Sequence, residues 1–141
     1  MNPIQAWLHR AMIKLVKNEP MYWEFLRDLR NHIEVRTGFI QQSHIGETDH
    51  KKYMEKYGEC YYICLVDDVP AGFVGVIDTD IRIATSPDYQ QRGLGKFMIQ
   101  ELVERHPDSV AKVKVENEAS LRLFESCGFV RKYYILEKEE D

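Results

Sequence analysis

Residues 85–96 constrain the fold of this chain more than any other segment. An alternating apolar run at 81–85 is followed by the polar turn 86–88, and Gly93 and Gly95 then open an amphipathic run. This pattern predicts a strand that passes through a turn into a helix. The glycines let a ligand approach the backbone, and the unpaired N–H groups of a helix N-terminus attract an anion such as a phosphate. We therefore expect an anion site built from backbone amides at this turn.

The composition is that of one globular domain covering residues 1–141. The chain is 44% apolar and 30% charged, which excludes disordered and low-complexity chains. Its longest apolar runs, 61–66 and 69–77, are strand-sized and far shorter than the roughly 20 residues of a membrane span. A net charge of −4 without a broad basic stripe argues against nucleic acid as a partner.

The cysteines and the N-terminus indicate a cytoplasmic protein. The first ten residues hold Gln5, His9 and Arg10 without the apolar stretch of a signal peptide. Cys60, Cys64 and Cys127 are an odd number, and we interpret all three as reduced thiols. We expect no metal, because no second pair of ligands stands at the spacing of a zinc site.

Periodicity predicts a mixed α/β (α+β) domain of order β-α-α-β-β-β-α-β-α-β. The sheet is expected to be mostly antiparallel and flanked by helices, with Thr48 capping the second helix and Gly58 ending it. The expected strands are 11–17, 61–66, 73–77, 81–85, 110–115 and 129–137. The expected helices are 21–32, 48–57, 94–105 and 118–126.

Two spaced motifs resemble the GCN5-related N-acetyltransferase (GNAT) superfamily. Residues 90–95, Gln-Gln-Arg-Gly-Leu-Gly, match the signature [QR]-x-x-G-x-[GA]. Residues 117–129, Asn-Glu-Ala-Ser-Leu-Arg-Leu-Phe-Glu-Ser-Cys-Gly-Phe, resemble the second hallmark N-x-x-[AS]-x-x-[LF]-[YF]-x-x-x-G-F. The resemblance covers about residues 11–137 and implies acetyl-CoA as the acetyl donor, held where the fourth and fifth strands separate.

The resemblance also implies which residues hold acetyl-CoA. A strand pairs with the pantetheine arm, a loop cradles the diphosphate, and an asparagine contacts the arm. The matching positions here are Ile83, Ala84, Thr85, Gln91, Arg92, Gly93, Leu94, Gly95, Lys96 and Asn117. The implied reaction is direct attack of a neutral amine on the thioester, with strand N–H groups stabilising the oxyanion.

The sequence departs from the family at both proton-transfer positions. Phe124 stands where many members have a tyrosine acid, and Lys112 stands where many have a glutamate base. As catalytic replacements we select Asp80 for the base and Tyr133 for the acid, although a turn residue and a packing residue are the plain alternatives. Other candidates are Tyr134, Ser120, Cys127 and Glu116.

A second resemblance, at 29–36 and at Phe39, Ile45, His50 and Tyr53, is to GNAT members that acetylate amino sugars, with Leu29 in place of their tryptophan; ribosomal-protein and antibiotic acetyltransferases share parts of it. The short segment 37–48 can wall a small pocket, so we expect a small amine acceptor and select Arg36 and His44 as its binding residues. The alternatives are an acyl-CoA sensor or scaffold, an enzyme acting on a protein amine, and a different acyl group. A monomer or a homodimer is expected.

Overall fold

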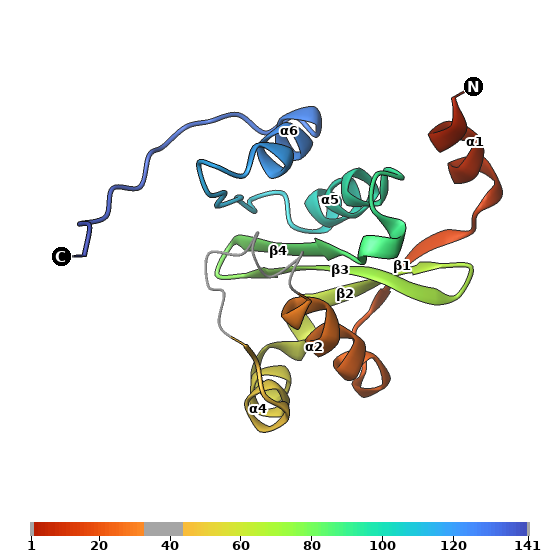
Figure 1. The fold of residues 1–141 in the computed structure, drawn as a ribbon, viewed down its shortest axis with the longest axis horizontal. Coiled ribbons are helices and arrows are strands. Elements are labelled where there is room, and N and C mark those ends of the chain that lie inside the picture. The colour runs from red at the N-terminus through yellow and green to blue at the C-terminus, as the bar shows by residue number, and fades with distance from the viewer. Residues whose placement is uncertain (1, 33–43, 141) are drawn as a thin grey trace.

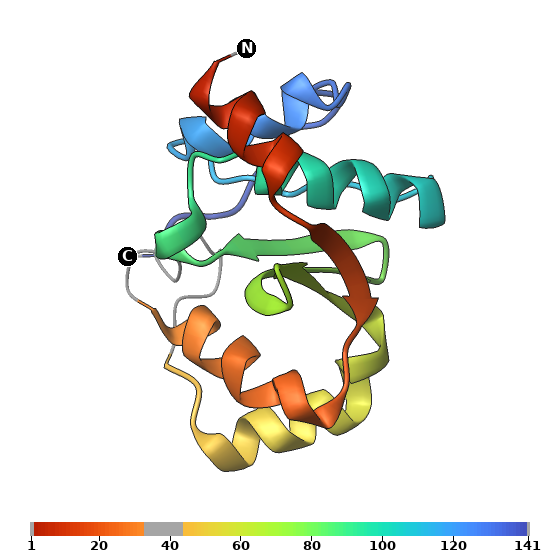
Figure 2. The ribbon, with the colours of Figure 1, turned by 90° about the vertical axis from the view of Figure 1, so that its right-hand side faces the viewer.

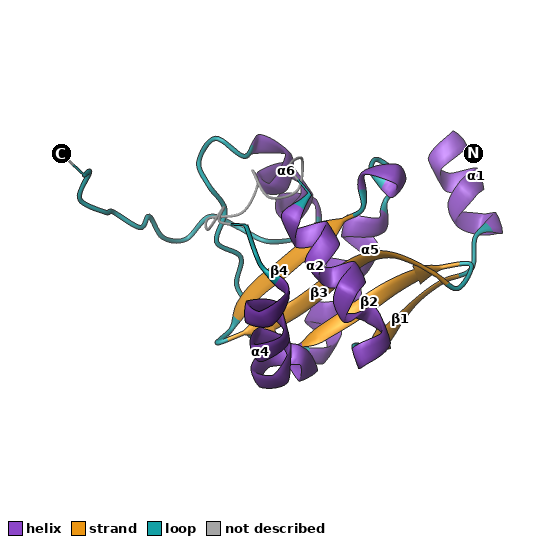
Figure 3. Ribbon diagram, turned by 60° about the horizontal axis from the view of Figure 1, so that its bottom comes forward, coloured by secondary structure: helices purple, strands orange, loops and turns teal. Residues whose placement is uncertain are grey.

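The computed structural model describes residues 2–32 and 44–140 and has a four-stranded sheet covered by helices on both faces (Figure 1). The strands β1 (Ile13–Lys17), β2 (Tyr61–Val66), β3 (Val69–Ile77) and β4 (Asp80–Thr85) lie in this order and are antiparallel. Helices α2 (Trp23–Asn31) and α4 (Glu47–Tyr57) cover one face. Helices α5 (Leu94–Arg105) and α6 (Glu118–Ser126) lie on the other side (Figures 2 and 3). The predicted α/β class is confirmed.

Two tight turns build the predicted meander of β2, β3 and β4. Asp67 and Asp68 have φ of 47° and 66°, and Asp78 and Thr79 have φ of 49° and 68°. Consecutive residues in the left-handed region are the mark of two-residue hairpin turns whose twist matches that of the strands. Alternation then divides the core between the faces: Ile63 and Phe73 pack with α2 and α4, while Cys64 and Val74 pack with α5.

Short 3-10 turns join several elements: Pro20–Tyr22 before α2, Gly58–Cys60 after α4, and Pro87–Tyr89 after β4. The predicted cap of α4 is wrong by two residues, since Gly46 occupies the cap and the helix begins at Glu47. Gly58 ends that helix as expected, but in the right-handed conformation (φ −54°), so the chain continues into a 3-10 turn.

Helix α1 (Pro3–Arg10) was not expected from the apolar pattern. A capping box starts it: the N–H of Gln5 donates to Asn2 Oδ1 (2.8 Å) and the N–H of Asn2 donates to Gln5 Oε1 (3.1 Å). Proline at the first helical position adds to the signal. The helix lies beside the layer of α5 and α6 (Figure 2).

Two predicted strands, 110–115 and 129–137, do not form within the described residues. Val110 makes a single parallel bridge to Asp80 and the chain then leaves the sheet. Residues 130–140 follow an extended, exposed path away from the sheet (Figure 1). A strand exists only while a neighbouring strand supplies its hydrogen bonds, and beyond the Val110 bridge the edge of β4 has none from the C-terminal segment.

Among the described residues, no helix is long and apolar enough to cross a membrane. All three cysteines are free thiols, as predicted. Burial raises the pKa of the Cys64 thiol to about 12, so this side chain is an inert part of the core.

Candidate active site

A cleft opens where β4 separates from the segment that follows α5. The two are joined at one end: the N–H of Ile81 donates to the Val110 carbonyl oxygen (2.9 Å), and the N–H of Val110 donates to the Thr79 carbonyl oxygen (2.8 Å). Past this bridge they diverge and leave a cleft of about 730 Å³. One wall is β4 with the start of α5, and the other is residues 114–117 with α6.

Every residue selected from the family motifs lines this cleft except Arg92. The motifs therefore identified one contiguous surface from three separate parts of the chain. Residues that the sequence did not single out also contribute. These are Tyr89, Gln90, Lys114, Ala119 and Leu123, with Glu116 and Ser120 from the wider list of candidates.

Along the cleft, the edge of β4 has backbone groups that no strand of the described residues pairs. In an antiparallel pair, alternate residues hydrogen-bond to the neighbouring strand, and those between them point the other way. The N–H of Ile81 points outward, to Val110, so the N–H groups of Ile83 and Thr85 point outward as well. A ligand in the cleft can therefore pair with β4 as an added strand would.

The β4–α5 loop (residues 86–93) ends in a conformation that exposes the first N–H groups of α5. Gln91 and Gly93 both adopt positive φ, of 62° and 84°. Acidic residues are absent from the first turn of α5, and the cations Lys96 and Lys114 line the cleft beside it. Free amides, a helix dipole and two lysines together fit an anion such as a diphosphate.

Gly95 permits the close packing of α5 on α6. A Cβ at this position would lie 2.9 Å from Leu123 Cδ2, closer than carbon atoms tolerate. Asn117 has a local role too, because its Oδ1 caps α6 by accepting from the N–H of Ser120 (3.2 Å). The cleft is thus formed by two helices whose approach depends on a glycine and a cap.

The proposed proton-transfer residues do not come together. Asp80 lies at the Val110 bridge and does not line the cleft, and its Oδ2 is 2.9 Å from Lys112 Nζ. Tyr133, predicted to reach the cleft from a last strand, is instead 90% exposed on the extended C-terminal segment. Phe124 is buried and packs edge-on against Phe129, with 5.2 Å between ring centroids.

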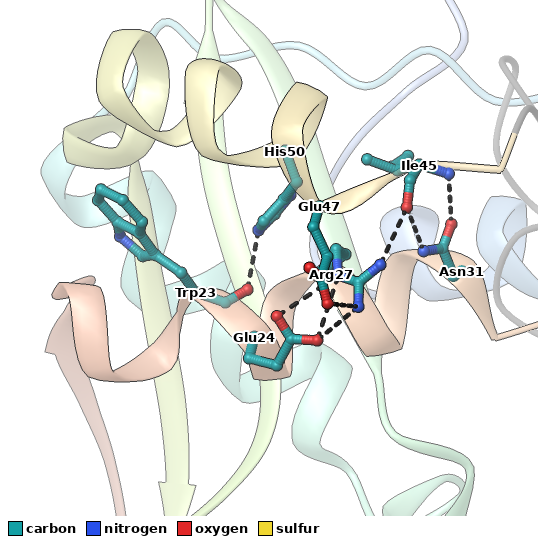
Figure 4. A network of polar contacts seen from close by, with 7 residues as sticks. All are labelled: Trp23, Glu24, Arg27, Asn31, Ile45, Glu47 and His50. Atoms are coloured by element: carbon teal, nitrogen blue, oxygen red, sulfur yellow. Dashed lines mark hydrogen bonds and ion pairs between the residues drawn. The ribbon is translucent and has the colours of Figure 1, made fainter.

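Residues of the second resemblance, among them Asn31, Ile45 and His50, belong to a polar network that joins α2 to α4 and the segment before it (Figure 4). The Asn31 side chain makes two hydrogen bonds to the backbone of Ile45: its Nδ2 donates to the Ile45 carbonyl oxygen (2.8 Å), and its Oδ1 accepts from the Ile45 N–H (2.7 Å). Arg27 donates to Glu24 (2.7 Å) and so lowers the pKa of that carboxyl. Of the two residues selected for acceptor binding, Arg36 lies outside the described residues, and His44 is exposed ahead of α4.

His50 is a structural residue in this network. It is 3% exposed, and its Nε2–H donates to the Trp23 carbonyl oxygen (2.8 Å). Burial lowers the pKa of the imidazole, so the neutral form is favoured. Nearby, the hydroxyls of Tyr53 and Tyr61 share a 2.6 Å hydrogen bond, and burial raises the pKa of Tyr61 above its ordinary value.

Comparisons with known proteins agree with this fold. The family model described as "Acetyltransferase (GNAT) family" matches residues 18–129. A relative from Salmonella typhimurium, a [ribosomal protein bS18]-alanine N-acetyltransferase, is 33% identical over 101 residues, which are 63% of this chain and 68% of the relative.

Solved structures share the fold at lower identity. The spermidine N-acetyltransferase of Vibrio cholerae, solved with CoA and spermine, has a TM-score of 0.74 and 19% identity over 89% of this chain and 85% of its own. The aminoglycoside N-acetyltransferase AAC(6')-Iy, solved with CoA, has a TM-score of 0.70 and 16% identity over 92% and 95%. The chain belongs to the acetyltransferase (GNAT) family, and it is an N-acetyltransferase.

Proposed function

We propose that this enzyme transfers an acetyl group from acetyl-CoA to a primary amine of a small acceptor, in the cleft between β4 and α6. The observation that carries the proposal is the opening between β4 and residues 114–117, where no strand within residues 2–32 and 44–140 pairs with the N–H groups of Ile83 and Thr85. The cleft also borders the exposed amides at the start of α5. An elongated cosubstrate with a polar arm and a diphosphate fits both features.

Each wall of the cleft has a defined part in holding acetyl-CoA, which supplies the acetyl thioester. The amides of Gly93, Leu94 and Gly95 bind the diphosphate, and Lys96 and Lys114 offset its charge. The Ile83 and Thr85 N–H groups pair with the arm and polarise the acetyl carbonyl. Asn117 both caps α6 and offers its side-chain amide to the cleft.

Proton transfer from the acceptor amine is assigned to Asp80. Asp80 does not line the cleft itself; it lies at the Val110 bridge, where β4 and the segment after α5 begin to separate, and 21% of its side chain is exposed. The thiol of the leaving group has an ordinary pKa of about 8.5, so a thiolate can depart without a strong acid. The exposed position of Tyr133 gives the acid role no structural support.

The small-acceptor proposal rests on two observations. The structural neighbours named above are a spermidine N-acetyltransferase and an aminoglycoside N-acetyltransferase. An amine of an amino sugar is less basic than a lysine side chain, whose pKa is about 10.4, and suits a site with one ion-paired carboxylate. A protein N-terminal amine is the second candidate, because the Salmonella relative is named for the alanine of a ribosomal protein.

The test is acetyl transfer from acetyl-CoA to a panel of polyamines, free and nucleotide-linked amino sugars, aminoglycosides and peptides with N-terminal alanine. Thiol release with a small amine is the expected result. If only peptides are acetylated, the acceptor is a protein amine and the small-acceptor proposal is wrong. If the protein binds CoA tightly but acetylates no amine, the result favours the alternative of an acyl-CoA sensor or scaffold.

A further inference from the structure

Arg92 stands out because it is the one residue selected from the family motifs that does not line the cleft. Its guanidinium carbon lies 5.3 Å from the centroid of the Trp7 indole and 5.6 Å from that of the Tyr89 ring. Trp7 belongs to α1, and Tyr89 both lines the cleft and contacts Arg92. The cation therefore links the N-terminal helix to a wall of the cleft.

Apolar contacts from the same helix reach the next residue of the loop. A Cβ built on Gly93 would lie 3.4 Å from Leu8 Cδ1 and 3.9 Å from Ile4 Cγ2. Arg92 is thus flanked by two residues in the left-handed region, Gln91 and Gly93, and α1 packs against this stretch. Gln91 is not a glycine, so its left-handed conformation persists only when the surrounding structure stabilises it.

We propose that α1 braces the β4–α5 loop, with Trp7 acting as a positioning residue for the diphosphate site. Helix α1 lies outside the residues that the family model matches. Trp7 touches the loop through Arg92 and does not line the cleft, so it acts by fixing the direction of the loop amides. The inference rests on the proposed function where it concerns CoA, and on contacts alone where it concerns the loop.

The energies decide what size of effect to expect. A cation over an aromatic face at an exposed site contributes about 0.5–1 kcal/mol, which corresponds to a change in binding of about 2- to 5-fold. Trp7→Leu removes the ring while keeping apolar bulk beside the loop. The change in affinity should appear for CoA and be absent for pantetheine, which has no diphosphate to meet the loop.

The experiment measures the dissociation constants of CoA and pantetheine for the wild type, Trp7→Leu, Arg92→Met and the double variant. His9→Ala, an exposed position on the same helix, is the matched control. We expect Trp7→Leu to weaken CoA by about 2- to 5-fold and to have no further effect in the Arg92→Met background, since the two side chains act as one unit. His9→Ala should bind like the wild type.

Three results would overturn the brace: unchanged CoA affinity in Trp7→Leu, equal weakening of CoA and pantetheine, or tighter CoA binding through a released Arg92. Amide hydrogen exchange of residues 91–95, measured without any ligand, separates the brace from the proposed function. Exchange should rise in Trp7→Leu and stay unchanged in His9→Ala. If amide exchange differs between the variants in this way but the wild type binds no CoA, the proposed function is contradicted while the brace is supported.

Discussion

Lys112 Nζ lies 2.9 Å from Asp80 Oδ2, so the candidate base and the cation at the usual base position form one ion pair. About half of the Lys112 side chain is exposed, against 21% for Asp80. The pair joins the first residue of β4 to the segment after Val110, beside the parallel bridge that closes the cleft. The ion pair therefore joins two residues that the sequence analysis considered separately, Asp80 as the candidate base and Lys112 as the residue at the usual base position.

We predict that Asp80→Asn lowers kcat by about 10²-fold, the lower range for loss of a general base. Lys112→Met should change kcat by less than about fivefold, because a half-exposed ion pair contributes at most about 1 kcal/mol. The measurement is kcat at saturating acetyl-CoA. An Asp80→Asn enzyme with near wild-type kcat would reduce Asp80 to a turn and pairing residue.

Gly95→Ala is predicted to weaken CoA binding and to destabilise the fold by less than about 1 kcal/mol, below the usual cost of overpacking a core. The added Cβ would meet Leu123 Cδ2 at 2.9 Å, so the flexible Leu123 side chain, which lines the cleft, must move. Adding Leu123→Ala should restore much of the lost affinity. Gly46→Ala is the control, since nothing lies within 4 Å of a Cβ there. Failure of the rescue would show that Gly95 meets the ligand directly.

Phe124→Tyr is expected to change kcat by less than about tenfold, although removing a working general acid costs 10²-fold or more. The Phe124 ring is buried against Phe129, so we expect a hydroxyl added there to lie within this packing and not at the leaving group. Steady-state kinetics decide the matter. A large gain in turnover would mean that the ring reaches the thioester and that the wild type lacks an acid it can use.

His50 should make the stability of the fold depend on pH. Its pKa is lowered in the native state, so the unfolded chain takes up the proton more readily. The native state keeps its full stability above the ordinary histidine pKa of about 6.5 and loses it as the pH falls below that value. Urea unfolding at a series of pH values should show a smaller loss for His50→Gln than for the wild type. Equal losses would show that His50 is not responsible.

The sequence predicted most of the residues along one wall of the cleft, because short motifs encode that wall. A strand, a polar turn and glycines at Gly93 and Gly95 specify the start of α5 locally, and all of these were confirmed. The brace was missed, since the contact between Trp7 and Arg92 joins residues far apart in sequence and α1 has no buried residue to give an apolar stripe. Its one local signal is the capping box at Asn2 and Gln5.

The predicted last strand is a case in which the sequence pattern predicted an element that does not form. Residues 129–137 have the aromatic and β-branched composition of a strand, yet Tyr133 and Leu136 are 90% and 92% exposed. Composition reports how well a segment suits a sheet, while the sheet itself also requires an open partner edge. In the described fold the free edge of β4 lines the cleft and does not pair with residues 129–137, so this segment forms no strand.

The central claim is that acetyl-CoA binds in the cleft between β4 and α6, and calorimetric titration with a cleft-filling variant tests it most directly. Ala119 is an exposed residue of α6 that lines the cleft, and Arg122, on the same helix, does not line it. We predict that the wild type and Arg122→Trp bind acetyl-CoA alike and that Ala119→Trp binds at least about tenfold more weakly, a loss of about 1.4 kcal/mol. Absence of binding to the wild type, or equal binding by Ala119→Trp, would contradict the account.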